Sequence, residues 1–128
     1  EQIKGKGADF IVDAICQNAT KLAEQSGAKA IITFTDMGYT AKRIASYRPE
    51  AEIFAFTQNP NIVNQLSLVW GVEAILCGKF NHIDEAVEYT IDLLKRTGRL
   101  AENDTVIHVG TTPVSANDKC NMLKITYI

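Results

Sequence analysis

The stretch AIITF, residues 30–34, followed at once by TDMGYT, residues 35–40, decides the fold class of this 128-residue chain. The first part is a short apolar run rich in β-branched and aromatic residues, which is typical of a strand buried on both faces. After Gly38, apolar residues recur at helical spacing over residues 40–47, until the Arg48-Pro49 pair ends the pattern. The stretch therefore predicts a buried strand that leads through a loop into a helix.

The same alternation extends toward both ends of the chain. Before the stretch, residues 9–26 have the pattern of an amphipathic helix with Asp9 as its cap and Gly27 as its stop, and residues 1–8 resemble a linker ahead of a domain at 9–128. After it, strands are expected at 53–57, 72–77 and 105–109. Helices are expected to begin at Asn59-Pro60 and near Asn81, which forms with Asp84 an acidic variant of a capping box.

The final strand, residues 122–128, differs from the others because only a loop, residues 111–121, separates it from the strand at 105–109. Without an intervening helix it should turn back antiparallel, at an edge of the sheet. Its Ile125 and Tyr127 alternate with polar residues, and an uncovered edge invites pairing with a partner. The chain is thus an α/β protein with a mostly parallel five-stranded sheet, an antiparallel last strand and helices on both faces.

Composition limits the function classes. With 46% hydrophobic residues, 22% charged residues and a net charge of -2, the chain fits one soluble domain without the basic surface of a nucleic-acid or membrane binder. No apolar run reaches membrane-spanning length, and the amino terminus does not resemble a signal peptide. Cys16, Cys77 and Cys120 lack the spacing of a zinc site, so a reduced, cytoplasmic setting without a metal site is expected.

Ligands of open parallel sheets bind beyond the carboxyl ends of the strands, so the loops at 35–40 and 110–118 are the first candidates. The first enters a helix whose opening amides suit a phosphate, with Gly38 allowing a tight turn and Thr35 and Thr40 offering hydroxyls. The negative charge of Asp36 opposes this interpretation, and a strand-to-helix turn needs a glycine whether or not anything binds. Neither loop has a P-loop or dinucleotide fingerprint.

No catalytic residue emerges from the remaining chemistry-bearing side chains. His82 and His108 have no nucleophile beside them in the sequence, so packing or surface roles are expected for both. Trp70 is interpreted as a core or interface anchor rather than as a stacking platform.

Ordered matches over nearly the whole chain resemble the carboxy-terminal domain of pyruvate kinases. They comprise the run from Ala30 through Gly38 to Tyr47-Arg48-Pro49, then IFAFT at 53–57, then LSLVWGV at 66–72. The resemblance implies a three-layer α/β/α sandwich. It also implies that phosphoryl transfer from phosphoenolpyruvate to ADP, with magnesium and potassium, occurs in a separate barrel domain, so no catalytic residue and no cofactor is assigned to this chain. Subunit contacts in a homotetramer and binding of a phosphorylated effector are further implications.

Carried over residue by residue, the resemblance places the effector phosphate in the loop at 35–40 with help from the loop at 111–121. The matching positions are Thr35, Gly38, Thr40, Ser115 and Asn121. Asp36 and Met37 stand where responsive members often have a basic or hydroxyl residue and a serine, and the second loop lacks a Ser-Gly or Thr-Gly pair. These departures count against fructose 1,6-bisphosphate as the effector. Another effector, or no effector at all, is left open.

Three functional hypotheses follow. The first is a regulatory and oligomerisation domain of a cytoplasmic pyruvate kinase that contacts the catalytic barrel of its own chain and performs no catalysis alone. The alternative is a free-standing module that binds a phosphorylated metabolite in the same crevice. A third, a small cysteine-dependent enzyme, would require an acidic, exposed thiol.

Overall fold

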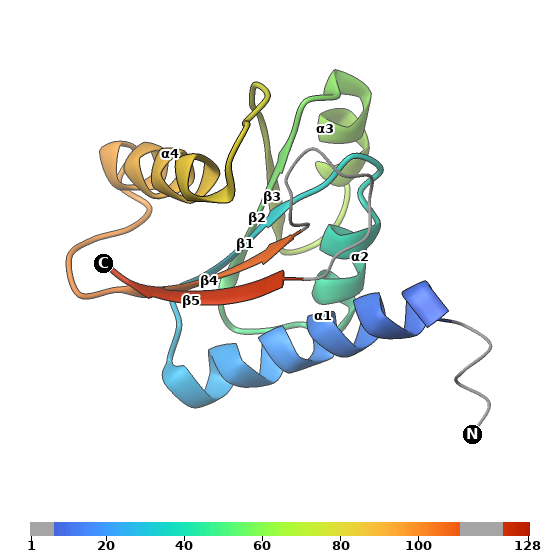
Figure 1. Ribbon diagram of the computed structural model, residues 1–128, viewed down its shortest axis with the longest axis horizontal. Helices are drawn as coiled ribbons and strands as arrows, with labels where there is room; N and C mark the ends of the chain where they lie inside the picture. The colour runs from blue at the N-terminus through green and yellow to red at the C-terminus, as the bar shows by residue number, and fades with distance from the viewer. Residues whose placement is uncertain (1–6, 111–121) are drawn as a thin grey trace.

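The computed structural model describes residues 7–110 and 122–128 as a five-stranded sheet between two layers of helices (Figure 1). The strand order is β3-β2-β1-β4-β5, and all pairs are parallel except the antiparallel pair of β4 and β5. The elements, in chain order, are α1 (Gly7–Ser26), β1 (Ala30–Phe34), α2 (Tyr39–Ser46), β2 (Glu52–Thr57), α3 (Pro60–Leu66), β3 (Val72–Leu76), α4 (Ile83–Arg96), β4 (Thr105–Gly110) and β5 (Met122–Tyr127). The predicted three-layer sandwich with an antiparallel last strand is confirmed.

The alternating side chains of the central strands separate two cores. Ile31, Ile53 and Ile107 pack against α1 and α2 on one face of the sheet. Ile32 and Phe54 belong to the core beneath α4 on the other face. Because β1, β2 and β4 bury side chains on both faces, their sequences read as nearly continuous apolar runs.

The helix boundaries follow local chemistry with two corrections. Asn59 caps α3 as predicted, since its side-chain oxygen accepts a hydrogen bond from the N–H of Asn61 at 2.9 Å. Asp9 is not a cap, because α1 begins at Gly7 and Ala8, a strong helix former, extends it beyond the expected start. The predicted link between Asn81 and Asp84 is also wrong.

The N–H of Asn81 donates instead to Glu85 Oε1, at 3.3 Å. His82 is the residue that precedes α4, so Glu85 occupies the third helical position. That is the position from which a longer carboxylate reaches back in a capping box.

The strand order reverses between β1 and β4. From β1 the chain proceeds outward to β2 and β3, and only then crosses to β4 on the other side. The carboxyl end of β1 therefore lies at the switch point where open α/β sheets bind ligands. The loop that follows β4 lies outside the described residues, whereas the loop between β1 and α2 is described completely.

Candidate ligand loop at the start of helix α2

Hydrogen bonds hold the loop between β1 and α2 at both of its ends. The N–H of Thr35 donates to the carbonyl oxygen of Phe56 at 3.0 Å, which extends the register of β1 with β2 by one residue. The hydroxyl oxygen of Thr35 accepts a hydrogen bond from the N–H of Gly38 at 2.7 Å. Thr35 thus ties the end of β1 to the start of α2, a structural role that was not predicted from the sequence.

Gly38 is required by the backbone and by its neighbours. Its φ of 88° lies in the left-handed region, which residues with a β-carbon rarely adopt. A β-carbon would also lie 3.3 Å from Leu66 Cδ2 and 3.6 Å from Ile62 Cγ2, both on α3. The backbone and the packing therefore require a glycine at position 38 whether or not a ligand binds.

The opening turn of α2 combines features that favour an anion with one that opposes it. Gly38 is the N-cap residue and supplies no side-chain cap, so the dipole and amides of the helix end can act on a bound group. Thr40 is buried, while Met37 and Asp36 are exposed. Residues 35–40 contain no Lys or Arg, so an anion bound here would depend on backbone donors and hydroxyls.

A three-residue cluster beside the loop joins α2 to α1. Arg43 donates to both carboxylate oxygens of Asp13, from Nε to Oδ1 at 2.8 Å and from Nη2 to Oδ2 at 3.0 Å. The Tyr39 hydroxyl donates to the same Oδ1 at 2.9 Å. Hydrogen bonding from Arg43 lowers the pKa of Asp13, against the opposing effect of burial, and the same bond raises the pKa of Arg43.

The structure brings together three of the five predicted site residues. Thr35, Gly38 and Thr40 share one loop and helix start, whereas Ser115 and Asn121 lie outside the described residues. The cluster around Asp13 was not predicted from the sequence. Its only local signal is the i, i+4 spacing of Tyr39 and Arg43 on one face of α2; their partner lies far back along the chain and carries no local mark.

His108 is fully buried on β4 and faces α4. Its Nε2 lies 2.9 Å from the Thr90 hydroxyl, and its ring stacks at 6.2 Å on Phe34. Burial, with a smaller effect of the Lys124 charge, lowers the pKa of His108 to about 4. This residue is a neutral core histidine, in agreement with the packing role expected for it.

The two described cysteines do not have the properties of nucleophiles. Cys16 is completely buried in α1, and burial raises the pKa of the Cys77 thiol to about 11. Neither thiol is acidic and exposed, as a cysteine-dependent enzyme would require, and Cys120 lies outside the described residues.

Trp70 is 66% exposed, so the expectation of a core position is wrong and its use at an interface stays a prediction. It follows α3 in a turn at the surface, and the Arg48 guanidinium lies over its ring at 5.1 Å from the centroid. A cation above the indole partly covers a side chain that the core does not enclose.

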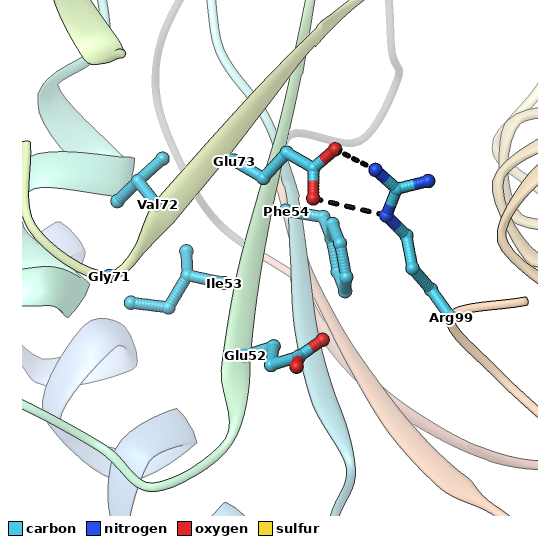
Figure 2. Close-up of a pocket in the computed structure, with 7 residues that line it drawn as sticks. All are labelled: Glu52, Ile53, Phe54, Gly71, Val72, Glu73 and Arg99. Carbon is cyan, nitrogen blue, oxygen red and sulfur yellow. Dashed lines mark hydrogen bonds and ion pairs between the residues drawn. The ribbon is translucent and has the colours of Figure 1, made fainter. Parts of the chain in front are cut away.

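A shallow hollow of about 320 Å³ lies at the amino ends of β2 and β3, at the opposite end of these strands from the ligand loop (Figure 2). Figure 2 shows Arg99 directed toward Glu73, with Nε donating to Oε1 at 3.0 Å and Nη2 donating to Oε2. Glu52 lines the same hollow. Because its one arginine is committed to Glu73, this hollow offers a ligand little free positive charge.

Residues 7–110 and 122–128 contain no group of three or more His, Cys, Asp or Glu side chains able to hold a metal ion. None of their helices is long and apolar enough to cross a membrane.

An open α/β sandwich with a candidate ligand loop at its switch point is thus the class of protein that the fold defines. The family model described as pyruvate kinase, alpha/beta domain, matches residues 13–126. The chain therefore belongs to the pyruvate kinase alpha/beta domain family.

Individual relatives agree with this assignment. A pyruvate kinase of Lactobacillus delbrueckii subsp. bulgaricus is 35% identical over 100% of this chain and 21% of its own length. A pyruvate kinase of Geobacillus stearothermophilus is 34% identical over 92% of this chain and 20% of its own. The crystal structure of a pyruvate kinase from Cryptosporidium parvum superimposes with a TM-score of 0.82 at 30% identity, over 91% of this chain and 22% of that one. The chain thus spans about a fifth of the length of these relatives.

Proposed function

We propose that this domain is the regulatory and assembly part of a cytoplasmic pyruvate kinase. In this proposal phosphoryl transfer from phosphoenolpyruvate to ADP, with magnesium and potassium, takes place in a barrel domain of the same full-length protein, and the 128 residues have no turnover alone. The observation that carries the proposal is the position of the loop between β1 and α2 at the switch point of a pyruvate kinase family domain.

The regulatory role requires a ligand that distinguishes two states of the full-length protein, since a ligand shifts an equilibrium only through different affinities. Thr35, Gly38 and Thr40 are proposed to contribute to its site, together with Ser115 and Asn121 of the second loop. The absence of Lys and Arg from residues 35–40 and the exposed Asp36 count against a doubly phosphorylated sugar as the effector.

The test is a titration with fructose 1,6-bisphosphate, ribose 5-phosphate, AMP and glucose 6-phosphate, followed by amide shifts and thermal midpoint. A ligand of the native state raises the midpoint in proportion to the logarithm of its concentration above its Kd. Binding that shifts amides of residues 35–40 supports the effector role. If none of the four compounds binds, the effector role for these ligands is rejected and assembly remains.

The assembly role is proposed to use the outer edge of β5. Among the residues that the structure describes, this strand pairs with β4 alone, and Tyr127 is 76% exposed. Ile125 is partly buried against the core beneath α1, so changing it would disturb folding as well as association. Tyr127→Glu is therefore the cleaner variant, and sedimentation should show a smaller assembly. Leu68→Glu, at an 88% exposed position after α3, is the control, and an unchanged mass of the Tyr127→Glu variant would reject this edge.

A further inference from the structure

We propose that Asp13 is a positioning residue for the ligand loop: from α1 it holds the first turn of α2 in place. The proposal deepens the regulatory role proposed above, and the part of it that concerns ligand affinity rests on that role. Asp13 touches Tyr39 and Arg43 of α2, so it would act on a bound ligand through the orientation of the helix.

The carboxylate of Asp13 spans one turn of α2. Tyr39 and Arg43 are four residues apart and therefore lie on the same face of α2. Both meet Asp13, which accepts three hydrogen bonds of 2.8 to 3.0 Å from the two of them. The two-pronged contact of a planar guanidinium with a carboxylate also fixes direction, which a single lysine contact would not.

The two helices differ in how firmly each is held. In α1, Val12 and Cys16 flank Asp13 and are buried against the sheet. In contrast, α2 has eight residues, a length at which a helix depends on tertiary contacts rather than on its own hydrogen bonds. Asp13 thus projects from a well-anchored helix onto a short one that needs support.

Tyr39 brings this support to the loop itself. It is the first residue of α2 and follows Gly38, whose N–H is bonded to the Thr35 hydroxyl. The path from α1 to the loop therefore consists of the Asp13 to Tyr39 hydrogen bond, one peptide bond and the turn of Thr35 and Gly38. A tilt of the first turn of α2 would redirect the same amides that a ligand is proposed to meet.

The test must separate the effect of the Asp13 charge on a bound anion from the effect of Asp13 on the position of α2. Asp13→Asn alone would remove a negative charge near the loop and free Arg43, which would favour an anion even if the helix became looser. The double variant Asp13→Asn/Arg43→Gln leaves the net charge unchanged. Its matched control is Asp92→Asn/Arg96→Gln, which breaks an ion pair of the same 2.8 Å length within α4.

Hydrogen exchange of the full chain without ligand is the first measurement. In the Asp13→Asn/Arg43→Gln variant, amides of residues 38–46 should exchange faster by roughly fivefold, the order expected for losing a partly exposed ion pair. In the control, amides of residues 38–46 should exchange as they do in the wild type. An Asp13→Asn/Arg43→Gln variant that exchanges like the wild type over residues 38–46 would overturn the proposal, as would an equal acceleration of these amides in the control.

Affinity is the second measurement, with fructose 1,6-bisphosphate and AMP as the probes. If the wild type binds either one, the double variant should bind it several-fold more weakly and the control should not, and equal affinities would overturn the proposal. If the wild type binds neither, the effector role for these probes fails on its own. The exchange experiment then decides whether Asp13 positions the loop.

Discussion

The Thr90 hydroxyl and His108 Nε2 lie 2.9 Å apart in the core between α4 and β4. The same hydroxyl lies 2.9 Å from the carbonyl oxygen of Val87, which can only accept. When the hydroxyl donates to Val87, it accepts from His108, and this arrangement places the ring proton on Nε2. Nδ1 is left without a hydrogen-bond partner among the described residues, which is consistent with a ring that stays neutral.

Stability should fall in acid because of His108. The folded-state pKa, about 4, lies below the ordinary value of 6.5, so between these two values the unfolded chain binds more protons. The stabilisation is complete above pH 6.5 and is progressively lost as pH falls toward 4, by about 2–3 kcal/mol. Urea unfolding at pH 7 and pH 4.5 measures it. His108→Leu should flatten the profile, His82→Gln should not, and identical profiles for all three proteins would contradict the assignment.

Removal of the Thr90 hydroxyl should be costly although the substitution is nearly isosteric. Thr90→Val leaves the buried Nε2–H without an acceptor, so the free energy of unfolding should drop by about 1–3 kcal/mol. Thr97→Val, at the C-cap of the same helix, is the control, because the Thr97 hydroxyl donates to a backbone carbonyl near solvent and its loss should cost less. In a His108→Leu background the Thr90→Val penalty should largely disappear, and a penalty that persists there would show that another contact of Thr90 dominates.

Gly38→Ala should destabilise the protein more than Gly98→Ala. Both glycines have positive φ, at 88° and 82°, so each substitution incurs a left-handed backbone cost of about 1–2 kcal/mol. Only at position 38 would the new methyl group also press on Leu66, at 3.3 Å, because no atom lies within 4 Å at position 98. Chemical denaturation of the two variants makes the comparison. Equal losses would mean that Leu66 moves aside without cost.

Trp70 should report directly on its surroundings because it is the only tryptophan of these 128 residues. With 66% of its surface exposed, its emission should resemble that of a hydrated indole and be quenched readily by acrylamide. Arg48→Gln should alter the emission by removing the cation over the ring, whereas Arg96→Gln should leave it unchanged. A blue-shifted, unquenched emission would contradict the exposed position or show that a partner covers this side chain.

Sequence patterns alone predicted the order of the elements and the class of the fold. Strands buried on both faces have to be continuous apolar runs, and residues 30–34 and 53–57 show this plainly. The antiparallel direction of β5 followed from the missing helix before it. Local chemistry also predicted the Asn59 cap, because the cap and its partner are two residues apart.

Only the tertiary structure decided which distant side chains meet. Asp13 and Arg43 are 30 residues apart, and nothing in either local pattern distinguishes this pair from the many other exposed charges on helices. The exposure of Trp70 could not be predicted from the sequence either. An indole beside apolar residues has the pattern of a core residue, and only the path of the turn after α3 shows that it lies at the surface. Periodicity and capping act over a few residues and can be read from one segment. Contacts between helices depend on how the sheet places them, so they exist only in the folded chain.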